Sequence, residues 1–398
     1  MFERLKPVPP DSILQLMLDC QADPNPNKVD LSAGVYKDAT GVTPIMGSVK
    51  EAERRRISSE ETKTYAGIAG NLRFNELITE LALGSEHAGI ADNRVNCVQT
   101  PGGSGALRVA AELIADAKPR VGLWLSDPSW ANHPALLGQS GLPLHRYPYY
   151  DRDNHSVLFE QMCHALGEAR EGDVVVLHGS CHNPCGADLT IDQWLELKRI
   201  VSRQKLIPLI DVAYQGMGQD LTQDAAGWRA LTEAVPESLI AYSCSKIFGI
   251  YRERTGALMT ISRDVASAQI TLSNLLGVVR QIYSMPPEHG AFLVAEVLSD
   301  PQLKNQWLSE LEEIRVRIAE MRRLLGRALT EHAGIDFSFI EREYGMFSFF
   351  GFSPKEVDQL AVQHSVYIVN SSRASIAGVT SSNVEYIARS VAAVLKQR

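Results

Sequence analysis

The sequence predicts an α/β protein in which helices cover both faces of a mostly parallel sheet, joined to a smaller α/β unit. Between residues 94 and 262, short runs rich in Val, Ile and Leu alternate with helical patterns, which is typical of parallel strands buried on both faces. After about residue 300 the pattern changes to a long amphipathic helix. The chain has 398 residues, enough for roughly two to three domains.

The predicted strands and helices follow one another in regular alternation. The strands are 94–100 (RVNCVQT), 121–126 (VGLWLS), 173–179 (DVVVLHG), 206–211 (LIPLID), 239–243 (LIAYS) and 256–262 (GALMTIS). Between them, 105–117 (GALRVAAELIADA) predicts one helix. A second helix begins at Thr190, which forms a capping-box pattern with Gln193.

The last hundred residues predict the smaller unit. Apolar residues recur there at steps of four and three, the spacing of one helix face: Trp307, Leu311, Ile314, Ile318, Met321 and Leu325. GMFSFFGFS, SVYIVN and a closing helix from Asn383 follow. We expect an N-terminal arm at 1–11, a small domain from 12–45 with 305–398, and a large domain at 46–304.

Composition narrows the class of protein. The net charge is −8, from 39 Lys and Arg against 47 Asp and Glu, so the chain lacks the basic excess of a nucleic-acid or membrane-surface protein. No apolar run reaches the ~18 residues of a membrane span, and the first residues do not resemble a signal peptide. The six scattered cysteines fit reduced thiols, and we expect a cytoplasmic protein.

Polar residues after the predicted strands are the candidate site, because ligands bind at the carboxyl ends of parallel strands. PGGSGALR, with Gly103 and Ser104, follows the first strand and opens a helix. Such a turn suits a phosphate, although a plain tight turn explains it equally well. Trp130 follows the next strand; it either stacks on a flat ring or simply packs beside a helix start, with His133 close by.

The segment SCHNPCGADLT allows two interpretations. His178, Cys181, His182 and Cys185 have metal-binding side chains, but no CxxC pair or second cluster accompanies them. Asn183 is the better functional candidate, as a hydrogen-bond donor in a strand-end loop.

An acid and a lysine end two of the buried strands. Asp211 closes an apolar strand, where a carboxylate needs a partner or a function; it could also cap a helix. Tyr214 would lie near it if a helix started there. Lys246 comes 35 residues later, about one strand-helix-strand step, so it reaches the same edge of the sheet. Partial desolvation lowers a lysine's pKa and favours nucleophilic or Schiff-base chemistry. A purely structural Lys246–Asp211 pair is the alternative.

One ligand accounts for all these strand ends together. Pyridoxal phosphate needs a lysine for its aldehyde, an acid for its ring nitrogen, an aromatic residue for its ring face, an anion site for its phosphate and a donor for its 3-oxygen. In that order the candidates are Lys246; Asp211; Trp130 with Tyr214; Gly103 and Ser104 with Ser243 and Arg254; and Asn183.

At this level of detail the chain resembles the aspartate and aromatic aminotransferases of the fold-type-I pyridoxal-phosphate enzymes. The likeness covers essentially the whole length. Its motifs are GVYKDATGVTP, TKTYAGIAG, QTPGGSGALRVAA, SWANH, HGSCHNPCGADLT, DVAYQG, SKIFGIYRERTG, RQIYSMPPEHG, GMFSF and SSRASIAG.

The resemblance implies a role for each cofactor-site residue. Lys246 would carry the cofactor as a Schiff base and then move the substrate proton, while Asp211, backed by His133, would keep the ring nitrogen protonated. Tyr214 and Asn183 would bond the 3-oxygen. The remaining cofactor contacts would be Trp130 on the ring and Gly103, Ser104, Ser243 and Arg254 on the phosphate.

The resemblance also implies substrate contacts and a second subunit. Arg373 would clamp the substrate α-carboxylate and Gly34 would lie beside the substrate, together with Trp130 and Asn183. The family is homodimeric. Tyr65 would reach the partner's phosphate, and Arg280 would meet a distal carboxylate of the substrate in the partner's site.

The departures from the family pattern bear on the substrate. Cys185 replaces a Thr in the Asn-Pro-Thr-Gly turn, and we expect little effect from it. Met285 stands where relatives commonly have Asn or Ser, which favours apolar side chains near Arg280. Ser104 resembles the aromatic-preferring members. The residues that resemble the aspartate-preferring ones are Val35, Lys37 and Thr43.

We therefore expect a ping-pong transaminase that moves the amino group of tyrosine, phenylalanine or aspartate to 2-oxoglutarate. A strict aspartate aminotransferase is the alternative. Other reactions on the same cofactor, such as β-elimination or decarboxylation, and a Cys/His metal-binding protein are less favoured.

Overall fold

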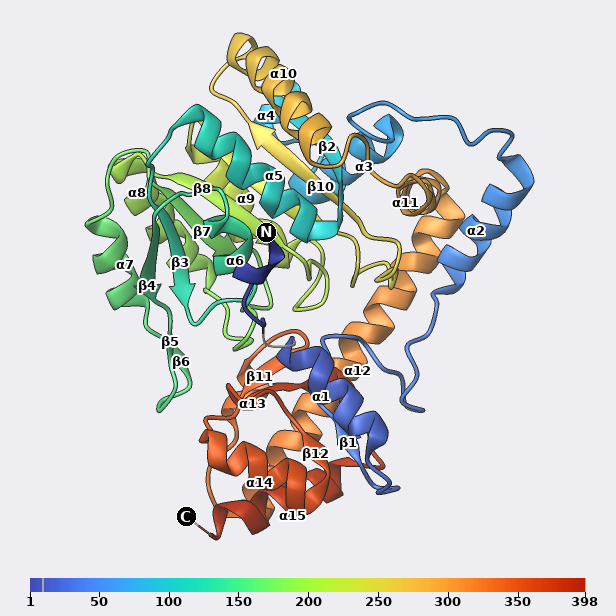
Figure 1. Ribbon diagram of the computed structural model, residues 1–398, viewed down its shortest axis with the longest axis vertical. Coiled ribbons are helices and arrows are strands. Elements are labelled where there is room, and N and C mark those ends of the chain that lie inside the picture. Colours follow the sequence, from blue (N-terminus) through green and yellow to red (C-terminus); the bar gives the residue numbers. More distant parts are fainter. Residues whose placement is uncertain (9–10, 398) are drawn as a thin grey trace.

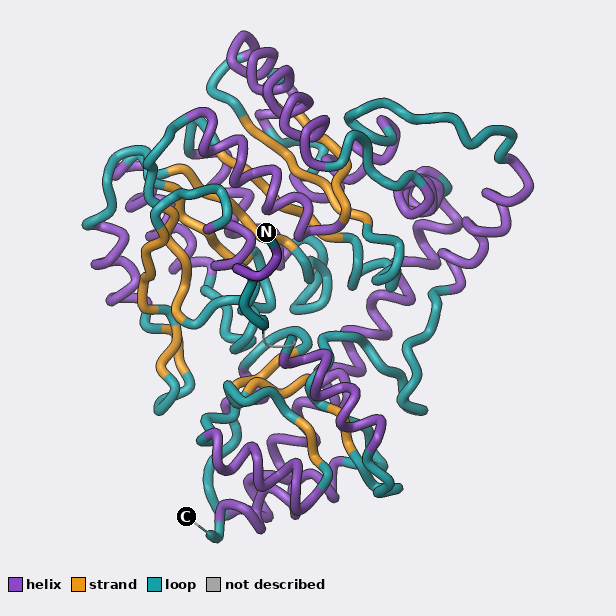
Figure 2. The backbone as a smooth tube through the Cα atoms, viewed as in Figure 1, coloured by secondary structure: helices purple, strands orange, loops and turns teal. Residues whose placement is uncertain are grey.

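The structure, a computed structural model, describes residues 1–8 and 11–397. Figure 1 shows an upper part built on one large sheet and a lower part made of helices and short strands. The long helix α12 (Pro301–Ala333) runs from one part into the other. In Figure 2 most of the strands gather in the upper part, as the alternating pattern of residues 94–262 predicts.

A seven-stranded sheet forms the centre of the upper part. Across the sheet the strands are β2 (Val95–Pro101), β10 (Thr255–Ile261), β9 (Ser238–Ser243), β8 (Ile207–Val212), β7 (Val174–His178), β3 (Leu123–Asp127) and β4 (Leu144–Pro148). The other six strands run in one direction, and β10 runs antiparallel to them. The mostly parallel sheet and all six strands predicted from the sequence are confirmed.

Helices cover both faces of this sheet. On one face lie α5 (Gly102–Ala117), α6 (His133–Gly138) and α10 (Val265–Ile282). Against the other face pack α2 (Gly47–Ser59), α3 (Leu72–Leu83), α7 (Phe159–Gly167), α8 (Ile191–Gln204), α9 (Gln223–Ala234) and α11 (His289–Ser299). Successive strand residues point to opposite faces. Leu239 and Ile240 accordingly belong to different apolar clusters, which explains the continuous apolar runs.

The two predicted helix starts differ in accuracy. The capping box of α8 is present: Thr190 Oγ1 accepts from the Gln193 amide at 3.2 Å, and Gln193 Oε1 accepts from the Thr190 amide at 2.9 Å. Helix α5 begins at Gly102, three residues before the predicted start. The glycine turn is therefore itself the first turn of the helix.

The apolar stripe of α12 is buried along its length. Trp307 stacks on Phe248, with ring centroids 4.6 Å apart, and its indole N–H donates to the Ile247 carbonyl at 2.7 Å. Both partners follow Lys246 directly in the chain. The first half of α12 thus fixes the backbone on which that lysine stands.

The second half of α12 holds the lower part through a buried arginine. Arg322 is 3% exposed and donates to the carbonyls of Ile340 at 3.0 Å and Gly345 at 2.9 Å. Its guanidinium also lies 3.5 Å from the Glu343 carboxylate. Burial raises the pKa of Glu343 to about 7, although Arg322 works in the opposite direction. The backbone leading to β11 (Phe347–Phe349) is therefore tied to α12.

The lower part contains α1 (Ser12–Ala22), α14 (Pro354–His364) and α15 (Val384–Leu395) around two small sheets. In one, β1 (Val29–Asp30) is parallel to β12 (Val366–Tyr367); in the other, β11 is antiparallel to β13 (Arg373–Ser375). The remaining short elements are η1 (Phe2–Arg4), α4 (Ala88–Ala91), β5 (Tyr150–Asp151), β6 (Ser156–Val157), α13 (Phe339–Arg342) and η2 (Ile376–Gly378).

The expected domain boundaries stay a prediction. Residues 9 and 10 of the expected arm, and residue 398, lie outside the described residues. In the described part of the chain, no helix combines the length and the apolar character needed to cross a membrane.

Replacing Arg322 by Met should destabilise the protein by about 3 kcal/mol, because several buried carbonyls and the Glu343 carboxylate lose their donor. Urea unfolding would measure the change. The exposed neighbour Arg323 is the matched control, and Arg323→Met should change stability by less than ~0.5 kcal/mol. Equal effects of the two substitutions would contradict the assigned role of Arg322.

Candidate active site

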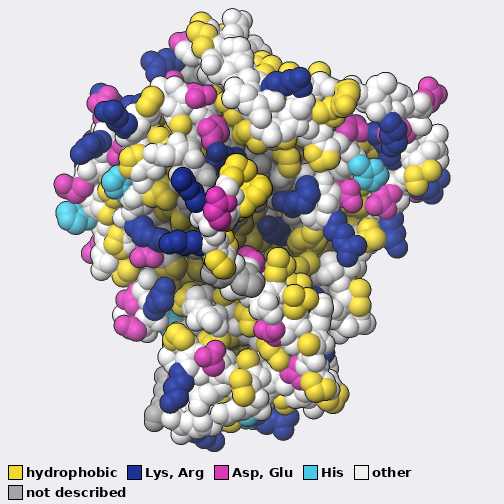
Figure 3. Space-filling view, viewed as in Figure 1, with side chains coloured by type: hydrophobic (Ala, Val, Ile, Leu, Met, Phe, Trp, Pro, Cys, Tyr) yellow, Lys and Arg dark blue, Asp and Glu magenta, His cyan; other side chains and the backbone are white. Residues whose placement is uncertain are grey.

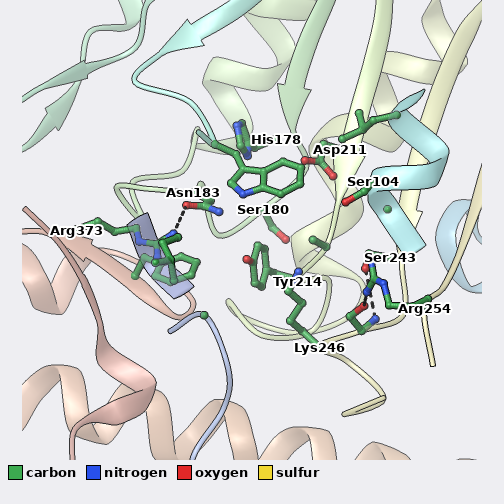
Figure 4. A pocket seen from close by; sticks show the side chains of 18 residues that line it. Ser104, His178, Ser180, Asn183, Asp211, Tyr214, Ser243, Lys246, Arg254 and Arg373 are labelled. Atoms are coloured by element: carbon green, nitrogen blue, oxygen red, sulfur yellow. Dashed lines mark hydrogen bonds between the residues drawn. The ribbon is translucent and has the colours of Figure 1, made fainter. Parts of the chain in front are cut away.

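A cavity of about 250 Å³ opens where the upper part meets the lower part. Figure 4 shows its side chains converging from both parts. It is lined by Ile13, Gly34, Gly103, Ser104, Leu107, Trp130, His178, Ser180, Asn183, Asp211, Ala213, Tyr214, Ser243, Ser245, Lys246, Arg254, Phe347 and Arg373. All the predicted site residues are in this set except Tyr65 and Arg280.

The strand directions explain why these residues meet. Parallel strands end at a common edge of the sheet, so the segments after β2, β3, β7, β8 and β9 all reach the cavity. The antiparallel β10 begins at that same edge. Arg254, which directly precedes β10, is therefore brought beside Ser243, which ends β9.

Lys246 extends into the cavity from the turn after β9. Its Nζ lies 5.1 Å from the centre of the Tyr214 ring, and the two side chains lie together in Figure 4. Burial lowers the pKa of Lys246 to about 8; the Asp211 carboxylate raises it and Arg254 lowers it further. A substantial fraction of the amine is therefore uncharged at mildly alkaline pH, and an uncharged amine is the nucleophilic form.

The Asp211 carboxylate is hydrogen-bonded to a histidine. His133 Nε2 lies 2.9 Å from Asp211 Oδ2, and it must donate because an ionised carboxylate only accepts. Ser129 Oγ lies 2.8 Å from His133 Nδ1 and 3.2 Å from His178 Nε2. Burial acts to raise the pKa of Asp211, but the bond from His133 and nearby positive charge outweigh it and lower the pKa. The carboxylate thus stays ionised while buried.

These contacts decide between the earlier interpretations of Asp211. The carboxylate caps no helix: Asp211 lies within β8, and α9 starts only at Gln223. Its close partner is His133 rather than Lys246, which acts on Asp211 through its charge.

Tyr214 lies in a turn. The sequence placed Tyr214 near Asp211 on the condition that a helix started here, and that helix is absent. The turn still brings the phenol to the cavity, 6% exposed. Burial raises the pKa of Tyr214, so the hydroxyl keeps its proton and can donate.

The first turn of α5 forms a cradle for an anion. Gly102 has φ +70°, and no side chain caps the helix, so its first amides are available to a ligand. A Cβ on Gly103 would lie 3.0 Å from Ser243 Cβ, which explains the glycine there. The guanidinium of Arg254 adds a positive charge to the same cradle, 3.4 Å from Ser245 Oγ.

Arg373 reaches the cavity from β13 in the lower part. It is 6% exposed, donates to the Ser32 carbonyl at 2.8 Å and lies 3.4 Å from Asn183 Oδ1. Its Nε has no hydrogen-bond partner among the described residues, and no carboxylate of those residues forms an ion pair with it. A buried guanidinium with free donors is suited to a carboxylate ligand.

The apolar wall beside Arg373 explains the predicted glycine. The Arg373 guanidinium lies 4.3 Å from the centre of the Phe347 ring. A Cβ on Gly34 would lie 2.8 Å from Phe347 Cζ. Any larger residue at position 34 would therefore force that ring to shift.

Tyr65 and Arg280 lie outside this cavity. Tyr65 is 92% exposed, and the exposed Arg280, near the end of α10, contacts the Ser284 hydroxyl. Their predicted contacts are with a partner subunit and stay predictions.

The Cys/His segment is organised by hydrogen bonds. Cys185 Sγ lies 3.1 Å from His182 Nδ1, and Ser126 Oγ lies 3.1 Å from His182 Nε2. Burial lowers the pKa of His182 to about 3, so the ring is neutral. Among the described residues, no group of three or more His, Cys, Asp or Glu side chains is arranged to hold a metal ion.

Several lining residues were missed at the sequence level. Ser180 directly follows a predicted strand, and Ser245 directly precedes Lys246. Both residues could therefore have been found from the sequence. Ile13 and Phe347 lie far away in the chain. Phe347 belongs to the GMFSF motif of the resemblance, which assigned it no role, and the apolar run around Ile13 does not distinguish it from a core residue.

The residues present fit pyridoxal phosphate. The cavity contains a lysine of lowered pKa, an ionised acid and an uncapped helix start with an arginine beside it. Two buried polar atoms, Ser180 Oγ and Arg373 Nε, have no partner in the described residues. A polar, anionic ligand would supply the missing partners.

Comparison with known proteins decides the family. Residues 26–391 match the model of aminotransferase class I and II. The chain belongs to the class I and II aminotransferases. It is a pyridoxal-phosphate-dependent transaminase, as the resemblance implied.

The relatives align with the chain from end to end. It is 44% identical to an aromatic-amino-acid aminotransferase of Paracoccus denitrificans, over 98% of this chain and 99% of that protein. It is 42% identical to an aspartate aminotransferase of Haemophilus influenzae, over 99% and 100%. The structure of an aromatic-amino-acid aminotransferase from Burkholderia pseudomallei, covalently bound to pyridoxal phosphate, superposes with a TM-score of 0.96 at 38% identity, covering 99% of each chain.

The lowered pKa of Lys246 predicts how the protein stripped of its cofactor reacts with a small acylating reagent. Acylation of Lys246 should increase with pH with a midpoint near 8, because only the uncharged amine reacts. Competitive labelling followed by mass spectrometry would measure this. The exposed Lys63 serves as the internal control for the reactivity of the reagent. A midpoint for Lys246 far above 8, or acylation of Lys246 that does not increase with pH, would contradict the prediction.

Proposed function

We propose that the aminotransferase moves the amino group of an aromatic L-amino acid or of L-aspartate to 2-oxoglutarate by a ping-pong mechanism. The observation that supports this proposal most directly is Arg373, a buried guanidinium whose free donors line the same cavity as Lys246. Amino acids and 2-oxo acids share the α-carboxylate that such a group binds. The relatives named for aromatic amino acids and for aspartate support both donor classes.

We assign the cofactor contacts as follows. Lys246 would hold the cofactor aldehyde, Asp211 would bind the ring nitrogen, and Trp130 would cover one ring face. Tyr214 and Asn183 would bond the 3-oxygen. Gly103, Ser104, Ser243 and Arg254 would hold the phosphate. When bound, pyridoxal phosphate supplies the electron sink that lets a Cα–H bond of the substrate ionise.

The protein contributes charge placement and proton transfer. Asp211 stays ionised because His133 donates to it, so it favours a protonated ring nitrogen. Lys246, once its amine is free and uncharged, would take the Cα proton at Nζ and deliver it to the bound cofactor. Arg373 holds the carboxylate so that the Cα–H faces that amine, a positioning effect.

The mixed character of the cavity supports dual donors. Ile13 and Phe347 contribute apolar surface for an aromatic side chain, while Lys and Arg side chains gather around the hollow at the junction of the two parts (Figure 3). We propose that the partner's Arg280 binds the distal carboxylate of aspartate and of 2-oxoglutarate. Met285 would favour apolar side chains nearby.

We further propose a homodimer in the cytoplasm. Tyr65 and Arg280 are exposed on this chain and lie outside its cavity; in a dimer they would complete the partner's site, Tyr65 at the phosphate. All six cysteines are free thiols, which is typical of a reducing compartment.

The decisive experiment is a steady-state panel of amino donors with 2-oxoglutarate. Tyrosine, phenylalanine and aspartate should each yield glutamate, with kcat/KM values in the range of ~10⁴–10⁸ M⁻¹s⁻¹ for the preferred donors. Turnover with aspartate alone would show a strict aspartate aminotransferase. Failure of all donors, or release of pyruvate and ammonia, would overturn the proposal.

Arg280→Leu should separate the two donor classes. In single-turnover half-reactions, the variant should lose ~10²-fold or more in kcat/KM for aspartate, since a charge-assisted bond to the distal carboxylate is removed. The phenylalanine half-reaction should change by less than about threefold. Arg252→Leu is the matched control, because Arg252 is exposed and has no assigned role. Equal losses for both donors would contradict the assignment of Arg280.

A further inference from the structure

A second cavity lies between α5, α10 and the edge of the sheet opposite to the active site. Its volume is about 330 Å³, within the range of small-molecule sites. Its floor is formed at the first residues of the parallel strands β7, β8 and β9, namely Val174, Ile207 and Ser238. Figure 1 shows α5 and α10 side by side over this face of the sheet.

The buried walls of this cavity are aliphatic. Leu113 and Ile114 come from α5, and Leu239 comes from β9. A wet cavity with such walls would leave apolar surface in contact with water. An apolar ring that displaced this water would be stabilised by the burial of the same surface.

Three buried residues of the lining carry hydroxyls, namely Ser238, Thr260 and Ser262. Ser262 Oγ donates to Thr271 Oγ1 at 3.4 Å. Ser238 Oγ has no partner among the described residues, but Ser238 pairs with Ile261 of the other apolar cluster and so points away from α5 and α10.

The hydroxyl that faces this apolar space without a partner is that of Thr260. Thr260 in β10 is 2% exposed, and its Oγ1 has no hydrogen-bond partner among the residues that the structure describes. Thr260 is paired with Leu239 across the antiparallel strands, so both side chains point to the face covered by α5 and α10. Buried hydroxyls are normally bonded, and an occupant with one polar group would supply the bond.

Three charged residues lie at the rim, and two of them are engaged, while the third, Asp116, is exposed to solvent. Lys118 donates to the Glu171 carbonyl at 3.1 Å, and Glu237 pairs with Arg263 at 3.0 Å. The buried part of the cavity has no ionised side chain in its lining. A charged occupant would find no oppositely charged side chain inside the cavity, so the occupant should be uncharged.

We propose that this cavity is a binding site for a small, uncharged ring compound that has one N–H or O–H group directed at Thr260. The site is separate from the catalytic cavity. Strand β9 runs from Ser238 at the new site to Ser243 at the catalytic one, a distance of about 17 Å along the strand. Occupancy therefore does not block the amino donor.

Indole and 1-methylindole are matched probes for the holoenzyme, since they differ in the single N–H donor. Calorimetry should show saturable, submillimolar binding of indole that persists at saturating amino donor. Thr260→Val removes the hydroxyl at nearly constant volume, and it should weaken indole about tenfold while leaving 1-methylindole unchanged. Thr271→Phe, on the α10 side of the cavity, should abolish binding of both probes.

The readouts separate this site from the catalytic one. Both variants should retain the cofactor absorbance and the turnover of the parent enzyme, because neither residue lines the catalytic cavity. Binding that competes with the amino donor, or that neither variant alters, would place indole in the catalytic cavity and overturn the proposal. Absence of saturable binding would overturn it as well. None of these outcomes depends on which amino acid is the preferred donor.

Discussion

The hydrogen bond from His133 to Asp211 is the constraint around which the catalytic cavity is arranged. A carboxylate that ends a buried strand would ordinarily take up a proton, since desolvation penalises its charged form. Here the bond from His133, at 2.9 Å, keeps it ionised. That negative charge in turn works against the desolvation of Lys246 and limits the fall of its pKa. The cavity can therefore hold a buried acid that His133 keeps ionised and a buried amine whose pKa that acid raises.

Much of the fold and most of the cavity could be predicted from the sequence, for a physical reason. Parallel strands buried on both faces leave uninterrupted apolar runs, and the polar residue after each run must lie at one edge of the sheet. Asp211, Asn183 and Lys246 are found in this way. The rule indicates position along the strand but no contact, so it left a Lys246–Asp211 pair open as an alternative. The resemblance placed His133 behind Asp211, and the structure has His133 there.

Other features had no local signal. Phe347 and Ile13 belong to the cavity only because the lower part folds against the upper part, and each resembles any core residue in its own stretch of sequence. The turn at Tyr214 was open to a helical interpretation because residues 211–216 contain no proline. Tyr65 and Arg280 are exposed on the single chain, so what they contact is decided by a second molecule rather than by this fold.

Helix α12 has a mechanical consequence for the site. It is a rod of 33 residues, about 50 Å long, and Trp307 anchors its first half beneath the lysine turn while Arg322 anchors the strand pair that bears Arg373 to its second half. The amine and the carboxylate clamp stand in different parts of the fold, yet both are fixed against this one continuous helix. Their separation across the cavity is therefore set by the length of α12 between Trp307 and Arg322.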